Sequence, residues 1–142
     1  MGYIPAVLLA ALALAASVAT TPAQRCDAAD VVVLAEVTGA TSEPTPANRI
    51  RTRWDLAVLG VLKGTRPTTA LTPGGTVAGL TLTISEAAPL QTDHRYLLFL
   101  RTRPDGDWVM GVDGAIAVQV GPDSPGADWT TLAPTLGRCA PR

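Results

Sequence analysis

Few side chains in this sequence have the types and spacing that catalysis requires. His94 is the only histidine among the 142 residues, so a Ser-His-Asp triad would have to use it as the general base. None of Ser42, Ser85 and Ser124 lies in the Gly-x-Ser-x-Gly turn that exposes a nucleophilic serine. His94 itself lies in the polar segment Gln91–Arg95, which is typical of an exposed turn. The sequence therefore predicts that the protein is not an enzyme.

Metal ligands are equally sparse. Asp105 and Asp107 flank a glycine, but a calcium loop needs more oxygen ligands than this pair supplies, so we expect a hairpin turn there. The two cysteines, Cys26 and Cys139, form no Cys-x-x-Cys motif, and a zinc site needs more ligands than they and one histidine provide. We predict no metal and no cofactor.

The charge distribution argues against nucleic acid as a partner. Eleven basic and twelve acidic residues give a net charge of −1, and no run of Lys and Arg interrupts the chain. The densest basic feature is the alternating row Arg49, Arg51 and Arg53, which Asp55 follows. This spacing suits a binding stripe, but it is also that of an ordinary solvated strand face, and we favour the second interpretation.

Three tryptophans are the remaining candidates for a ligand platform: Trp54, Trp108 and Trp129. Trp54 falls on the apolar face of an alternating segment. We therefore expect it in the core.

The N-terminal residues resemble a signal peptide. An apolar stretch at Ile4–Ala16 is followed by Ser17–Ala19, which has the small-x-Ala form of a cleavage site. We predict a signal peptide within residues 1–23, cleaved after Ala19 or, as the alternative, after Ala23, and a secreted or extracytoplasmic protein. A retained anchor is the competing interpretation, but the apolar stretch is short for a membrane span, so no stable span is expected.

In an oxidising compartment, two cysteines near the ends of the mature chain indicate one disulfide, Cys26–Cys139. The bond would close a loop of about 110 residues, for which loop entropy alone gives an upper stabilisation of about 4.7 kcal/mol. Residues 26–139 would then form a single domain with its termini joined.

The elements that must position these residues are strands. Residues 50–58 alternate between apolar and polar positions, and the alternation changes phase at Leu59-Gly60, which predicts a bulge. Turn signals separate the apolar segments, and no amphipathic pattern of helical length occurs. The expected elements are strands at 30–38, 50–58, 96–100, 108–110 and 115–120, a hairpin of 70–72 with 79–85 turning at 73–75, and a short helix from Asp128 to Leu132 as a weaker alternative to loop.

Five features follow one another along the chain: a cysteine after the export signal, then Ala29–Val37, Val58–Gly64, Pro73–Gly75 and Arg95–Leu100. The chain resembles bacterial secreted proteins with a netrin-like OB barrel, distantly related to the tissue inhibitors of metalloproteinases. The resemblance implies a five-stranded Greek-key barrel, in agreement with the strand pattern. We predict an all-β, OB-like barrel of five to seven strands.

Two functions follow as hypotheses. The first is a secreted, non-catalytic interaction module, a monomer that binds a protein or envelope partner through the loops Gly39–Asn48 and Thr65–Thr76 at one barrel end. The second is implied by the resemblance: a metalloprotease inhibitor that contacts a secreted metalloprotease through Cys26 and Asp27. That role requires the mature chain to begin at Cys26, because only a free α-amine has a lone pair for zinc.

Overall fold

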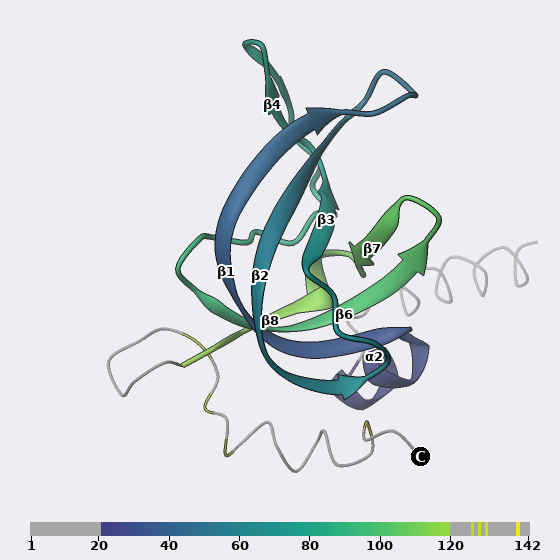
Figure 1. Cartoon of the computed structure of the whole chain (residues 1–142), viewed down its shortest axis with the longest axis vertical. Coiled ribbons are helices and arrows are strands. Elements are labelled where there is room, and N and C mark those ends of the chain that lie inside the picture. The colour runs from purple at the N-terminus through teal and green to yellow at the C-terminus, as the bar shows by residue number, and fades with distance from the viewer. Residues whose placement is uncertain (1–20, 120–125, 127, 129, 131–138, 140–142) are drawn as a thin grey trace, which may run out of the picture.

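The computed structural model describes residues 21–119 together with residues 126, 128, 130 and 139. A six-stranded sheet dominates it, with the order β1-β2-β3-β7-β6-β8 and a further pairing of β1 with β6 (Figure 1). The strands of this sheet are β1 (Val31–Pro44), β2 (Ile50–Lys63), β3 (Thr69–Pro73), β6 (Arg95–Arg103), β7 (Gly106–Val109) and β8 (Ala115–Val118). A separate two-stranded hairpin consists of β4 (Gly75–Val77) and β5 (Leu80–Leu82).

The pairing of β1 with β6 closes five strands into a ring. Strands β6, β1, β2 and β3 are neighbours in that order, which is the arrangement of a Greek key. The ring closes where β7 meets β3 in parallel at the pair Leu71 and Trp108, whereas the other pairs are antiparallel. The small all-β barrel predicted from the sequence is confirmed.

Strand β1 is longer than the sequence predicts. It continues to Pro44 through much of the expected loop Gly39–Asn48, and the connection to β2 is only residues 45–49. β1 continues because its polar residues there have cross-strand partners on β2: Thr41 pairs with Arg53, and Glu43 pairs with Arg51. Such pairs stabilise a two-stranded ribbon although the composition of β1 there is that of a loop.

The phase change in β2 is a bulge, as predicted. Leu34 pairs with Gly60 and Ala35 with Val58, so Leu59 is an extra residue without a partner on β1. Before it, the side chains of β2 alternate between the barrel interior and solvent. The bulge adds bend and twist to a strand that must curve around a small barrel.

The expected hairpin between residues 70–72 and 79–85 is wrong. Residues 69–73 pair with β2, and the hairpin is instead β4 with β5, turning at Ala78 and Gly79, which both have positive φ. Gly75, expected in the turn, starts β4 at a point where a Cβ atom would lie 2.7 Å from the Thr52 hydroxyl. Gly75 therefore permits close packing against Ser42 of β1 and Thr52 of β2 and does not reverse the chain.

Apolar side chains form two clusters, one on each side of β1. Inside the ring, alternate residues of β1 such as Val33 and Val37 pack with Leu98 and Leu100. On the outer side, Phe99 belongs to a second cluster, whose buried members are Cys26, Ala29, Val32, Leu97, Phe99, Val118 and Cys139.

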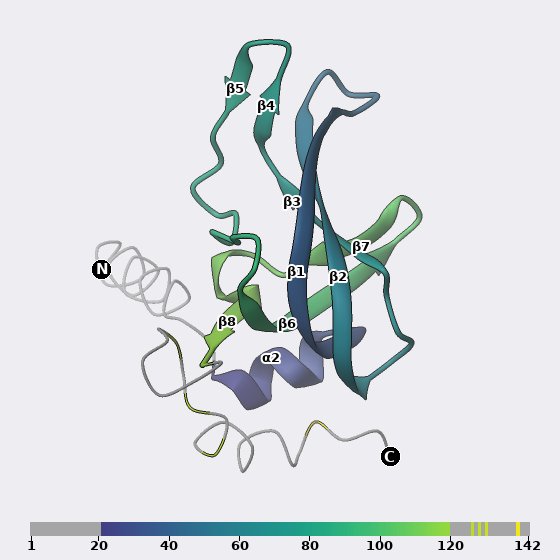
Figure 2. The same ribbon diagram turned by 60° about the vertical axis from the view of Figure 1, so that its left-hand side comes forward.

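The sequence analysis missed the helix α2 (Pro22–Ala28), which Figure 2 shows beside one end of the barrel. Its residue Cys26 belongs to the second cluster. Thr21 caps the helix: the hydroxyl of Thr21 accepts from the Gln24 N–H, and the Gln24 side chain accepts from the Thr21 N–H. Thr-x-x-Gln with proline at the first helical position is a helix-start signal that the sequence does contain.

Cys26 and Cys139 form the predicted disulfide, with Cα atoms 5.5 Å apart. Residues 1–20 of the signal peptide predicted within residues 1–23, most of the helix expected from Asp128 to Leu132, and Trp129 lie outside the described residues.

Removal of the disulfide should strongly destabilise the domain. For the Cys26→Ala/Cys139→Ala double variant we expect the free energy of unfolding to fall by about 2–5 kcal/mol, because the bond closes a long loop and joins a buried cluster. Urea unfolding followed by tryptophan fluorescence measures this. The reduced wild-type protein is the control, and a difference below about 0.5 kcal/mol would show that packing alone holds α2 in place.

Candidate binding cleft

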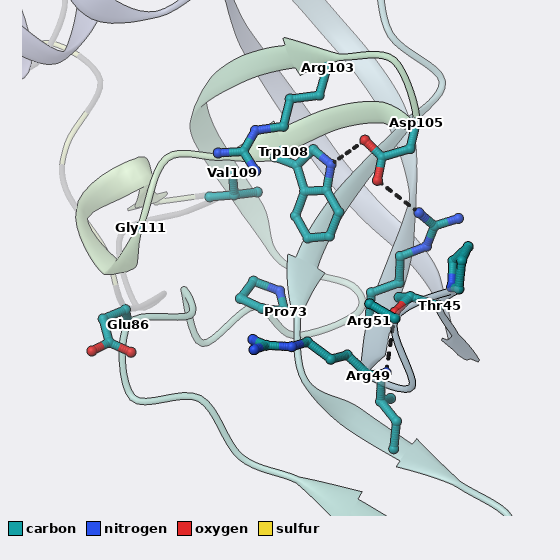
Figure 3. Close-up of a pocket in the computed structure, with 13 residues that line it drawn as sticks. Thr45, Arg49, Arg51, Pro73, Glu86, Arg103, Asp105, Trp108, Val109 and Gly111 are labelled. Carbon is teal, nitrogen blue, oxygen red and sulfur yellow. Dashed lines mark hydrogen bonds and ion pairs between the residues drawn. The ribbon is translucent and has the colours of Figure 1, made fainter.

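A cleft of about 540 Å³ lies beside the barrel (Figure 3). The β1–β2 turn at residues 45–49 forms one wall, and the β6–β7 hairpin with Arg103, Asp105 and Trp108 forms another. Pro73 at the end of β3 lies between these walls, and Glu86 also lines the cleft. Segments far apart in the sequence thus meet at this site: the β1–β2 turn, the β6–β7 hairpin and the connection from β5 to β6, which contains Glu86.

Asp105 joins the two walls. Its carboxylate accepts a hydrogen bond from the Trp108 indole N–H at 2.9 Å and another from the Arg51 guanidinium at 3.1 Å. Arg51 in turn donates to Glu43 at 2.8 Å across the β1–β2 ribbon. The chain Glu43–Arg51–Asp105–Trp108 therefore fixes the hairpin against the ribbon and orients the indole, as Figure 3 shows for its last three members.

The same contacts keep Asp105 ionised. The hydrogen bond from Trp108 lowers the pKa of Asp105 below its ordinary value of 3.8, and Arg51 and Arg103 lower it further against an opposing effect of burial. The carboxylate thus acts as a permanent hydrogen-bond acceptor near neutral pH.

Trp108 and Arg103 lie on one face of the hairpin. Trp108 pairs with Arg101, which places Arg103 at the diagonal position, and the Arg103 guanidinium lies 5.9 Å from the indole ring centroid. The sequence analysis did not single out Arg103. The Pro-Asp-Gly turn was the available signal, because a tight hairpin brings residues on either side of its turn onto a common face.

Trp54 behaves as expected of a core residue. It is partly buried and packs against the interior cluster, and its indole N–H donates to the Thr72 hydroxyl at 2.9 Å.

The row of alternating arginines is only partly the solvated face that we expected. Arg51 and Arg53 both form ion pairs with Glu43 on the neighbouring strand β1, which the sequence did not indicate. Arg49 precedes β2 and lines the cleft. Arg51 and Arg53 are therefore paired with carboxylates, and two residues of the row, Arg49 and Arg51, line the cleft.

The other predicted site residues lie elsewhere. His94 is half-buried beside Tyr96 in a smaller hollow of about 260 Å³, and a ring nitrogen of His94 lies 2.9 Å from the Thr92 carbonyl. Asp107 accepts from the Thr102 hydroxyl at 2.6 Å within the expected hairpin turn. Among the described residues, no cluster of three or more His, Cys, Asp or Glu could hold a metal ion.

Cys26 and Asp27 lie at the far end of β2 from the cleft. The Cys26 side chain is buried in its disulfide, whereas Asp27 is exposed. The ammonium group of Lys63, the last residue of β2, donates to the carbonyls of Cys26 and Asp27 at 3.0 and 3.3 Å.

The two predicted contact loops share a barrel end only in part, because Pro73 of the segment Thr65–Thr76 lines the cleft together with the β1–β2 turn, whereas residues 65–68 do not. The β1–β2 turn at residues 45–49 precedes β2, whereas the part of Thr65–Thr76 that remains a loop, residues 65–68, follows β2. Residues 69–73 of that segment form β3, because they pair with Arg51–Asp55, and residues 75–76 belong to β4.

Comparison of the chain with models of protein families gives no match, and comparison with curated protein sequences gives none either. In the part of the chain that the structure describes, no helix is long and apolar enough to cross a membrane.

The Asp105→Asn variant tests the contact between the walls. Because the folded-state pKa of Asp105 is lowered, its ionised form stabilises the fold above the unfolded pKa, and this contribution is lost as pH falls through the folded value. We expect a modest loss of stability at neutral pH that shrinks as the pH falls below 3.8, the ordinary value, and disappears below the lowered folded-state value. The difference in urea midpoint from wild type at each pH measures it.

Arg51→Gln is the companion variant: it leaves the Asp105 carboxylate in place and removes the guanidinium that pairs with both Asp105 and Glu43. Its loss of stability should shrink over the same pH range. A difference that stays constant across pH would mean that the ion pair does not hold the hairpin.

Proposed function

We propose that this protein is a secreted, non-catalytic interaction module that binds a partner protein in the cleft between the β1–β2 turn and the β6–β7 hairpin. The observation that supports the proposal is the position of the cleft. These two connections join the first and second, and the fourth and fifth, strands of the ring. In OB-type barrels, the loops that join strands 1 and 2 and strands 4 and 5 bind extended ligands.

The chemistry of the cleft favours binding over catalysis. Arginine side chains keep their charge at all relevant pH values and donate hydrogen bonds, but they do not exchange protons. Asp105 is held ionised by its neighbours, and both of its oxygens are engaged. The site therefore offers fixed donors and an aromatic face, which are the means of recognition.

A buried disulfide supports the extracytoplasmic location, because such bonds persist in oxidising compartments. Helix α2 supports the predicted cleavage after Ala19. That cut would keep the capping residue Thr21, whereas cleavage after Ala23 would remove it.

Site-specific photo-crosslinking tests the contact surface. A benzophenone amino acid at Ala47, an exposed residue that lines the cleft, should form a discrete adduct with a protein on the surface of the secreting cells or in their medium. The same group at Thr65, which is also exposed but lies beyond the other end of β2, should not. Adducts at Thr65 alone, or equal labelling at both positions, would contradict the proposed surface.

The metalloprotease-inhibitor hypothesis remains as the alternative, and one measurement separates it from the proposal. We expect an intact mass that corresponds to a chain beginning at Thr20 with its disulfide formed. A capping box before Cys26 and the engaged Cys26 carbonyl support this expectation. A chain that begins at Cys26 with a free amine would instead favour the inhibitor and call for a panel of metalloproteases.

A further inference from the structure

Two guanidinium groups in the cleft have no hydrogen-bond or ion-pair partner among the described residues. Figure 3 shows the Arg49 side chain extending from the β1–β2 turn toward Pro73, with its guanidinium group free of dashed contacts. Arg103 lies near the Trp108 ring, but that ring accepts no conventional hydrogen bond from it. Both residues are exposed.

Their situation differs from that of the neighbouring arginines. Arg51 and Arg53 are neutralised by Glu43, and Arg51 also by Asp105. Glu86, the other acidic residue of the cleft, forms no salt bridge with Arg49 or Arg103 in the described structure. Among the unpaired charged side chains of the cleft, the two guanidinium groups therefore outnumber the one carboxylate, that of Glu86.

Two hydrogen-bond acceptors of the cleft, the Asp105 carboxylate and the Thr45 hydroxyl, are already in use, whereas the Glu86 carboxylate accepts no hydrogen bond from a described residue. Asp105 accepts from Trp108 and Arg51, and the Thr45 hydroxyl accepts from the Arg49 backbone N–H at 3.3 Å. A ligand rich in hydroxyl groups, such as a neutral glycan, needs acceptors from the protein as well as donors. The cleft mainly offers donors, so the ligand must supply acceptor oxygens, and carboxylates pair with guanidinium groups most favourably.

The remaining lining is apolar. Ile50, Pro73 and Val109 contribute aliphatic surface beside the indole of Trp108. These side chains are half-buried or buried and therefore fixed in position. They suit an aliphatic or aromatic side chain next to a carboxylate, as occurs in a peptide in which acidic and apolar residues alternate.

From this geometry we infer that the cleft binds an acidic segment of a protein, with carboxylates on Arg49 and Arg103 and an adjacent apolar side chain against Trp108 and Pro73. The inference rests on the proposed function and adds the chemical class of the partner. The cleft lies between two hairpins and is open to solvent, so it can accept an extended segment of this kind.

Fluorescence polarisation with labelled peptides tests the ligand class on the mature protein. A peptide of alternating Glu and Leu should bind, whereas replacing Glu by Gln, or Leu by Ser, should weaken binding. Arg49→Gln and Arg103→Gln should each reduce the affinity roughly five- to tenfold, because each removes a charge-assisted contact at an exposed site. Raising the salt from about 0.05 M to about 0.5 M should also weaken binding several-fold.

Arg66→Gln is the matched control. Arg66 is exposed like the two cleft arginines but lies beyond the other end of β2, where it donates to the Val58 carbonyl. Equal effects of Arg66→Gln and Arg49→Gln, or no binding of the Glu/Leu peptide at all, would overturn the inference. Heparin binding that depends on Arg49 and Arg103, without peptide binding, would assign the site to sulfated glycans instead.

Failure of this inference is distinguishable from failure of the proposed function. If crosslinking at Ala47 captures a partner and the Arg49→Gln/Arg103→Gln double variant leaves that adduct unchanged, the cleft is a contact surface but its ligand is not acidic. If Ala47 yields no adduct, the proposed contact surface itself is wrong, whatever the peptides do.

Discussion

The architecture depends on one strand having two partners. Residues Val31–Glu36 of β1 pair with β6 on one edge, and from Val32 onward they also pair, allowing for the bulges, with the end of β2 on the other. This double pairing turns an open sheet into a ring and buries alternate side chains of β1 in separate clusters on its two sides. Beyond Val37, β1 pairs with β2 alone. The second half of β1 therefore leaves the ring as a ribbon, and the turn at its tip forms a wall of the cleft.

A ribbon that extends from a small barrel needs contacts that fix its direction, because a two-stranded hairpin is only marginally stable by itself. Glu43, Arg51 and Asp105 provide them by linking both ribbon strands to the β6–β7 hairpin. The arginine and the carboxylates are partly exposed, so each ion pair contributes little stability. Their importance is geometric: they hold the two walls of the cleft at a fixed separation and the Trp108 indole in one orientation.

The sequence predicts the parts of the fold that depend on local periodicity. Alternation in Ile50–Val58 predicted the inner and outer faces of β2, and the phase change at Leu59 predicted the bulge. It could not predict that β1 continues to Pro44, because the Thr and Ser residues there become a strand only through pairing with Arg51–Arg53. The misplaced hairpin has the same origin. Gly75 is required by the nearby Thr52 and Ser42 side chains, a tertiary constraint that resembles a turn signal in the sequence.

The candidate site was predicted less well than the fold for a related reason. The arginine row drew attention to Arg49, but only the three-dimensional meeting of two hairpins reveals Arg103 and Trp108 as its neighbours in the cleft. Charge balance is likewise a property of the structure. A net charge of −1 conceals the fact that Arg51 and Arg53 are compensated by Glu43, whereas Arg49 and Arg103 are not.

The cleft and the disulfide occupy opposite ends of β2, and this separation has a physical consequence. Stability at the α2 end depends on a covalent bond and a buried apolar cluster that includes Phe99. The cleft end depends on exposed polar contacts that contribute little to the free energy of unfolding. Substitutions at well-separated sites without shared partners have nearly additive effects. The lining of the cleft can therefore vary in charge and shape while the barrel that supports it remains folded, as expected of a rigid frame that presents a recognition surface.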